Sequence, residues 1–270
     1  MTSPSPTSGR FRQRFIGPVA PLYLLVLGMA GWQAVTAARL VPPYLLPPPS
    51  AVFARLVDLW SLFLSHTLVT ALEILLGFLL AFAVGVLLAV AVVYVRAFEA
   101  VVYPWIVVTQ AIPKVALGPL FVVWLGFGLL PKVVIAFLIA FFPILIDTVV
   151  GLRSVETESI FLLQSMGAGR WKIFYHLLLP NALPNLFAGM KVSITLATVG
   201  AIVGEFVGSN DGLGYVLLFA NGTMDTTMLF GALVLISLLA LLFYAVIYLL
   251  DGVCVRWHVS KRSGSASITM

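Results

Sequence analysis

Apolar runs of about 20 residues recur along this chain, and a helix of that length crosses the hydrocarbon core of a lipid bilayer. Charged residues make up only 9% of the sequence and hydrophobic residues 61%, whereas soluble domains average about 25% charged residues. We therefore predict an all-α, polytopic membrane protein with about six transmembrane helices. The expected spans are roughly 18–37, 67–94, 99–128, 133–150, 186–208 and 228–250.

One segment between two of these runs, residues 153–184, is charged and is patterned as a pair of helices. Ser154 can cap the start of a helix, and Glu156 and Glu158 fall in the first turn, where the helix dipole favours negative charge. Gly167 tolerates a positive φ and is expected to end this first helix. The helix is therefore predicted to run from near Ser154 to the glycine.

The part of the segment after the glycine is patterned as an amphipathic helix. Apolar side chains recur at i, i+3, i+4 and i+7 from Trp171 to Leu178, which places them on one face. Pro180 and Pro184 are expected to end this helix, because proline lacks the backbone N–H and crowds the preceding turn. Two helices joined by a glycine turn would present a folded surface outside the bilayer. An amphipathic helix lying on the membrane surface without a partner is the alternative.

The spacing in this segment resembles the cytoplasmic loop of the membrane subunits of bacterial ABC importers. In that family the loop carries Glu-Ala-Ala, three residues, Gly, nine residues and an aliphatic-x-Leu-Pro ending. Here Gly167 is followed by nine residues and then by Leu-Leu-Leu-Pro at 177–180. Residues 161–163 are Phe-Leu-Leu and stand where the family has Glu-Ala-Ala. This departure leaves the turn and the proline in place but changes the side chains that the first helix offers to a partner.

The resemblance implies a fold like that of a type I ABC importer permease, with this loop docked on a subunit that hydrolyses ATP. The implied partners are a cytoplasmic ABC ATPase dimer, a second permease subunit that is expected to be another copy of this chain, an extracytoplasmic solute-binding protein and the lipid bilayer, with no nucleic acid. The residues expected to couple to the ATPase are Glu156, Glu158, Phe161, Gln164, Gly167, Ala168, Arg170 and Pro180.

The resemblance extends to residues 112–128 and 200–217, which look like the permease subfamily that handles nitrate, sulfonates, taurine and vitamin precursors. The expected spans contain few positive charges that could hold a strongly anionic solute. We therefore favour a neutral, ring-containing nutrient, such as riboflavin or a pyrimidine-type vitamin precursor. The same machinery acting on sulfonate, taurine or nitrate is the alternative.

The chain carries no residue pattern for covalent chemistry. The single cysteine, Cys254, excludes an intramolecular disulfide and a cysteine-based metal site. No GxxxxGK[ST] phosphate loop and no GxSxG elbow occurs. We expect a non-catalytic subunit without a cofactor, with energy supplied by another subunit or by an ion gradient. An ion-coupled secondary transporter and a membrane scaffold without transport activity are the alternatives from other classes.

The distribution of basic residues predicts the orientation. With six spans and the amino end inside, all of the 15 Lys and Arg residues lie on or near the cytoplasmic side except Arg39, Arg55, Lys114 and Lys132. We expect a multi-pass protein of the bacterial inner membrane with both ends cytoplasmic. The expected organisation is a disordered cytoplasmic tail at 1–16, a first span with an extracytoplasmic Pro-rich loop and short helix at 17–61, a transmembrane core at 62–251 and a basic cytoplasmic tail at 252–270.

Polar residues inside the expected spans are candidates for the pore, because a charge at the centre of a membrane helix costs about 3 kcal/mol on insertion scales. Gln110, Lys114 and Glu205 are the candidate pore or gate residues. Glu73 and Asp147 are weaker candidates, since they lie near expected helix ends. Lys114 and Glu205 could instead pair between two helices, or reach toward water from helix ends.

Overall fold

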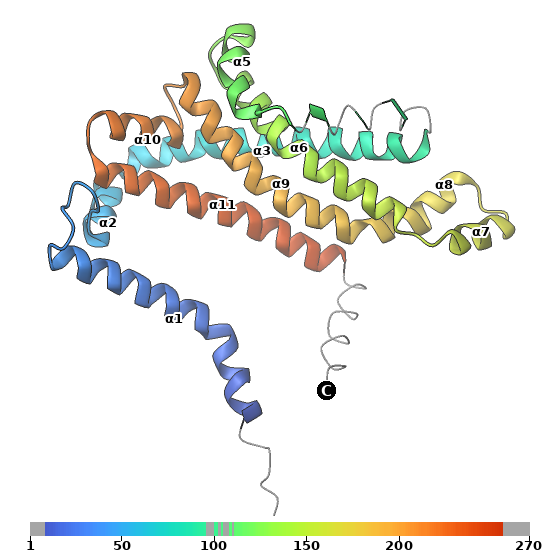
Figure 1. Ribbon diagram of the computed structural model, residues 1–270, viewed down its shortest axis with the longest axis horizontal. Helices are drawn as coiled ribbons and strands as arrows, with labels where there is room; N and C mark the ends of the chain where they lie inside the picture. The colour runs from blue at the N-terminus through green and yellow to red at the C-terminus, as the bar shows by residue number, and fades with distance from the viewer. Residues whose placement is uncertain (1–8, 96–99, 102–103, 105–107, 110, 256–270) are drawn as a thin grey trace, which may run out of the picture. The chain divides into compact units, whose positions relative to one another are not determined.

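The computed structural model describes residues 9–95, 100–101, 104, 108–109 and 111–255, and no strand occurs among them. Figure 1 shows the helices in chain order. The elements are α1 (Gly9–Ala37), α2 (Pro49–Asp58), α3 (Trp60–Tyr94), the 3₁₀ turn η1 (Lys114–Leu117), α5 (Gly118–Leu125), α6 (Leu129–Arg153), α7 (Thr157–Ser165), α8 (Arg170–Ile173), the π turn η2 (Phe174–Leu178), α9 (Leu179–Gly208), α10 (Leu213–Gly222) and α11 (Thr226–Cys254). The predicted all-α class is therefore confirmed.

Four helical segments in the described part of the chain are long and apolar enough to span a bilayer: Trp60–Tyr94, Leu129–Arg153, Arg170–Gly208 and Thr226–Cys254. They contain the expected second, fourth, fifth and sixth spans. The expected first span, 18–37, lies within α1. The expected third span, 99–128, is not one continuous helix: its described part from residue 111 contains the turn η1, the short helix α5 and the turn at Gly126–Gly128.

The chain divides into two compact units. The small unit consists of Met1–Trp60 and Ala220–Gly231, and the large unit of Ser61–Phe219 and Ala232–Met270. In the small unit, an ion pair of 2.5 Å joins Arg55 on α2 to Asp225 at the start of α11. The hydroxyl of Thr226 also donates to the carbonyl of Tyr44, at 3.0 Å. These contacts hold the Pro-rich loop against the α10–α11 turn.

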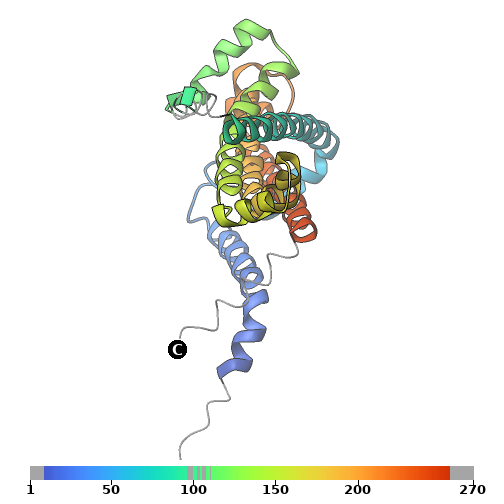
Figure 2. The same ribbon diagram turned by 90° about the vertical axis from the view of Figure 1, so that its right-hand side faces the viewer.

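The core of the large unit lies among α3, α6, α9 and α11, and Figure 2 shows α3, α6 and α9 beside one another. The antiparallel helices α6 and α9 make an extensive contact. They approach closely where a Cβ on Gly200 would lie 2.5 Å from Cα of Ala136. Helix α3 meets α6 in the same way, since a Cβ on Gly77 would lie 2.5 Å from Cβ of Ala136. Small residues allow this approach in membrane helix packing.

Pro180 and Pro184 do not end a helix, contrary to the sequence expectation. The helix continues from Arg170 to Gly208 through the π turn η2 at Phe174–Leu178. Pro180 is the second residue of α9, directly after this turn. A π turn shifts the hydrogen-bond register and widens the helix, so the missing N–H and the ring of Pro180 fall where the ladder is already interrupted.

Two other helix starts also differ from the expectation. Ser154 lies at the C-terminal end of α6, where its hydroxyl donates to the carbonyl of Gly151 at 2.9 Å, and α7 begins three residues later at Thr157. Helix α1 begins at Gly9, inside the segment 1–16 for which a disordered tail was expected. Residues 9–16 contain no proline, and Arg and Gln favour helix.

Candidate coupling surface and polar pocket

The turn after α7 is a Schellman motif built around Gly167. The N–H of Ala168 donates to the carbonyl of Leu163 at 2.9 Å, and the N–H of Gly167 donates to the carbonyl of Gln164 at 2.9 Å. Gly167 has a φ of 78°, a conformation that side chains with a Cβ rarely adopt. The predicted glycine turn is therefore present at the expected residue.

The 153–184 segment presents apolar side chains to its surroundings. No residue of α7 is buried, and Phe161 is 61% exposed and Trp171 71% exposed. The eight residues expected to couple to an ATPase all lie on this segment, with Ala168 and Pro180 half-buried and the other six exposed: Glu156, Glu158, Phe161, Gln164, Gly167 and Arg170. An apolar surface of this kind is typical of a site that a partner covers.

The segment is fixed to the helix bundle by its own small core. This core contains five buried residues from the end of α6, the π turn and the start of α9: Leu152, Ile173, Phe174, Leu178 and Ala182. Ile160, Leu163 and Ala168 from the α7 side pack against it. A displacement of α7 would therefore act directly on α6 and α9, which pack closely on each other.

A buried ion pair lies at the opposite end of α6. Nζ of Lys132 lies 2.5 Å from Oε1 of Glu73, and the two side chains are 7% and 0% exposed. The same ammonium donates to the hydroxyl of Ser209 at 2.8 Å. Sequence reasoning placed Glu73 near a helix end and Lys132 away from the cytoplasmic side. The structure places Glu73 well inside α3 and Lys132 in the first turn of α6.

Glu205 on α9 is also fully buried. The hydroxyl of Thr70 donates to its carboxylate at 2.6 Å, and the N–H of Gly214 donates to its other oxygen. The N–H of Leu213 donates to the Thr70 hydroxyl at 2.8 Å. A Cβ on Gly212, which has a φ of 101°, would overlap the Glu205 carboxylate. The glycine-rich turn after α9 is therefore held by α3 and by Glu205.

The candidate pore residues are not brought together. Gln110 lies outside the described residues. The ammonium of Lys114 lies 4.0 Å from the centre of the Phe142 ring, whereas the carboxylate of Glu205 accepts from Thr70 and Gly214. The suggested pair between Lys114 and Glu205 is therefore absent from the structure, and each side chain has a separate environment.

Two members of this network that sequence reasoning missed, His66 and Thr70, had a signal in the sequence. Together with Glu73 they are spaced at i, i+4 and i+7, so the three residues share one face of α3. Two of them contact the turn after α9: Nδ1 of His66 accepts from the N–H of Gly212 at 3.0 Å, and Thr70 accepts from Leu213. A polar stripe on an apolar helix predicts a polar partner, although it does not identify that partner.

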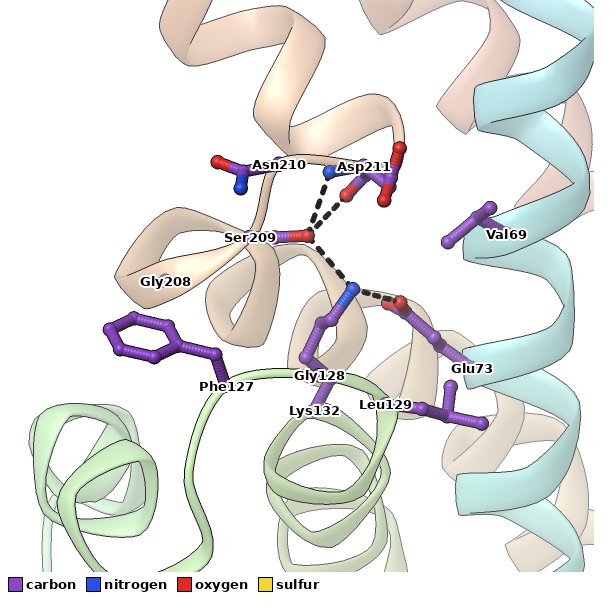
Figure 3. A pocket seen from close by; sticks show the side chains of 10 residues that line it. All are labelled: Val69, Glu73, Phe127, Gly128, Leu129, Lys132, Gly208, Ser209, Asn210 and Asp211. Carbon is purple, nitrogen blue, oxygen red and sulfur yellow. Dashed lines mark hydrogen bonds and ion pairs between the residues drawn. The ribbon is translucent and has the colours of Figure 1, made fainter.

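A pocket of about 590 Å³ opens beside the ion pair (Figure 3). It is formed by α3, the α5–α6 turn, the start of α6 and the end of α9 with the residues that follow. We call it the polar pocket. Its lining residues are Val69, Glu73, Phe127, Gly128, Leu129, Lys132, Gly208, Ser209, Asn210 and Asp211.

The large unit is a bundle of apolar helices, with the 153–184 segment and the polar pocket at opposite ends of α6. The family model for the binding-protein-dependent transport system inner membrane component matches residues 74–257. The chain belongs to this family and is a membrane permease of an ABC importer. It is not an enzyme, and ATP hydrolysis resides in a separate subunit.

Full-length relatives agree with this assignment. The riboflavin transport system permease protein RibX of Chloroflexus aurantiacus is 40% identical, covering 93% of this chain and 95% of that protein. The formylaminopyrimidine transport permease protein ThiX of Halalkalibacterium halodurans is 36% identical, with coverages of 88% and 94%. The putative aliphatic sulfonates transport permease protein SsuC of Bacillus subtilis is 28% identical, with coverages of 92% and 91%.

The fold is also similar to a solved structure. An inward-facing structure of the MetNI methionine ABC transporter contains a chain that matches with a TM-score of 0.54 and 25% identity, covering 73% of this chain and 94% of that chain. The assignment to an ABC importer decides against the two other classes, an ion-coupled secondary transporter and a membrane scaffold. It also implies an ATPase and a solute-binding protein as partners.

Proposed function

We propose that this permease imports a neutral, ring-containing nutrient, such as riboflavin or a pyrimidine-type vitamin precursor, and that two copies of the chain surround the path. The observation that supports this substrate class most directly is the degree of similarity. The riboflavin and formylaminopyrimidine permeases are 40% and 36% identical, whereas the sulfonate permease is 28% identical. Sulfonate, taurine or nitrate remains the second candidate class.

The charges of the polar pocket support the same choice. Its lining contains two carboxyl groups, Glu73 and Asp211, and a single ammonium, Lys132. That ammonium is already paired with Glu73 at 2.5 Å. A sulfonate or nitrate would approach a carboxylate and a neutralised lysine, which gives little electrostatic attraction. Binding of a neutral ring does not depend on such electrostatic attraction.

For the 153–184 segment we propose the role of docking site for the ATPase, with this segment and both chain ends on the cytoplasmic side. The exposed apolar side chains of Phe161 and Trp171 supply the contact surface. The Schellman turn at Gly167 fixes the angle between α7 and α8. Movement of the docked ATPase would then displace α6 and α9 through the core beneath the segment. If the helix bundle can pack in two ways, this displacement would switch the path between inward-facing and outward-facing states.

The substrate class is tested on the cognate solute-binding protein, because family importers take much of their specificity from it. Isothermal titration with riboflavin, a formylaminopyrimidine, taurine and nitrate compares the candidate classes directly. We expect tight binding of the flavin or the pyrimidine. Tight binding of taurine or nitrate without binding of either ring compound would contradict the proposed substrate. Uptake of the bound compound by proteoliposomes that contain the permease and its ATPase then confirms the transported solute.

A further inference from the structure

Phe127 occupies an unusual position at the edge of the polar pocket. It lies between Gly126 and Gly128, whose φ values are 79° and 129°, and its side chain is 81% exposed. A backbone with two positive-φ glycines in three residues turns sharply. The turn between α5 and α6 therefore presents an aromatic ring outward from the helices on either side of it.

The position of the Phe127 ring is nevertheless restricted by Gly208 at the end of α9. A Cβ on Gly208 would lie 3.0 Å from Cε1 of Phe127, so the ring packs closely over the end of α9. Figure 3 shows Phe127 beneath Gly208, and the Lys132 ammonium between Ser209 and Glu73. A large exposed aromatic surface at a pocket of 590 Å³ is suited to stacking, and pockets of this volume commonly bind small molecules.

Lys132 supplies a hydrogen-bond donor to the same pocket. Its ammonium has three N–H groups. Among the described residues, the Glu73 carboxylate and the Ser209 hydroxyl each accept a hydrogen bond from it. The side chain is 7% exposed and lines the pocket. The remaining N–H can donate to a carbonyl oxygen of a bound molecule, and the paired carboxylate holds the ammonium in place.

We propose that the polar pocket receives the flat heterocycle of the transported nutrient, with Phe127 stacking on the ring and Lys132 donating to a ring carbonyl. This inference rests on the proposed function and adds a site on the permease itself. The chemical class is a neutral, nitrogen-containing aromatic ring with at least one carbonyl. Asp211, which also lines the pocket, favours neutral rings over anions.

The probe for this site is riboflavin, because the anisotropy of its emission rises when this small molecule is held by a large particle. The permease with its ATPase is placed in nanodiscs and titrated with riboflavin in the absence of the solute-binding protein. We expect a saturable rise in anisotropy with the natural chain. Phe127→Leu should raise the Kd about tenfold, since stacking of a base on an aromatic side chain contributes about 1–3 kcal/mol. Phe127→Trp should retain binding.

Phe206→Leu is the matched control, because Phe206 lies on α9, is 43% exposed and does not line the pocket. It should bind riboflavin as the natural chain does. Absence of a saturable rise in anisotropy with the natural chain, or an unchanged Kd in Phe127→Leu, would overturn the proposed site. Loss of association with the solute-binding protein in Phe127→Leu, with riboflavin binding retained, would reassign the ring to a protein contact and would also overturn it.

Failure of this site is distinguishable from failure of the proposed function. If the solute-binding protein binds riboflavin but the permease does not, only the site on the permease is wrong. If the solute-binding protein binds neither flavin nor pyrimidine, the substrate class is wrong. The nanodisc titration in that case still decides whether the polar pocket holds a ring.

Discussion

Nζ of Lys132 and Oε1 of Glu73 lie 2.5 Å apart and join the first turn of α6 to the middle of α3. The glutamate is fully buried and the lysine nearly so. Burying two charges costs free energy that their attraction repays only when both partners are present. The pair therefore fixes how α3 and α6 are aligned, and its two residues depend on each other.

Lys132→Met is expected to lower the free energy of unfolding by about 3–5 kcal/mol, because it leaves the Glu73 carboxylate buried without its cation. The double variant Lys132→Met with Glu73→Gln should recover most of this loss, since no unpaired charge remains. Thermal unfolding of the purified proteins in detergent measures both. Equal destabilisation in the single and double variants would show that the pairing itself contributes little.

Gly200→Ala is expected to destabilise the large unit by about 1–3 kcal/mol, because the added Cβ would lie 2.5 Å from Cα of Ala136 and would push α9 away from α6. Gly252→Ala on α11 is the matched control, since a Cβ there meets no atom within 4 Å. Alanine favours helix over glycine by about 1 kcal/mol, so the control should be neutral or stabilising. Similar melting temperatures for the two variants would contradict the close packing of α6 on α9.

Local patterns predicted most of the long helices and the projecting segment. Apolar runs gave expected spans that lie inside α3, α6 and α11, and the positive-φ requirement of a helix end identified Gly167. The proline rule failed at Pro180, because the π turn at Phe174–Leu178 relieves the clash that normally ends a helix. A π turn depends on the packing around it, which single-residue preferences do not describe.

Contacts between distant residues could not be predicted in the same way. Lys132 and Glu73 are 59 residues apart, and their pairing depends on the rotation and register of two helices. The sequence indicated Glu205 as a buried charge, but its partner proved to be Thr70 and not Lys114. Apolar helices with small residues on several faces can pack in several registers, so the polar partners are decided only by the assembled bundle.

Asp225 gives the small unit a pH-dependent contribution. Burial would raise the pKa of its carboxyl, but the Met228 N–H and the Arg55 guanidinium stabilise the anion and hold the pKa below its ordinary value. The ionised form is therefore favoured in the folded state. The stabilisation of the folded state by ionised Asp225 is fully present above the ordinary pKa of aspartate. It is lost as the pH falls through the lowered folded-state pKa.

Asp225→Asn should remove this pH dependence and lower the free energy of unfolding at neutral pH by at most about 1 kcal/mol, because the ion pair is partly exposed to solvent. Asparagine can still cap α11 by accepting from Met228, so helix capping is unchanged. Melting temperatures of both proteins between pH 7 and pH 3 provide the comparison. If the melting temperature of Asp225→Asn falls with pH as steeply as that of the natural chain, the pH dependence comes from other groups.

Gly167→Val is expected to reduce copurification of the ATPase and solute uptake at least tenfold while leaving membrane insertion intact. A β-branched residue at a φ of 78° is strained by about 1–2 kcal/mol, which should open the Schellman turn and misdirect α8. No atom lies within 4 Å of the added Cβ, so the effect would come from the backbone alone. Gly167→Asn should have only a mild effect on copurification and uptake, because asparagine tolerates this conformation.

Gly169→Val is the matched control, because Gly169 has an ordinary φ of −72° and open space around it. Pull-down and uptake unchanged in Gly167→Val would show that the turn does not position the ATPase.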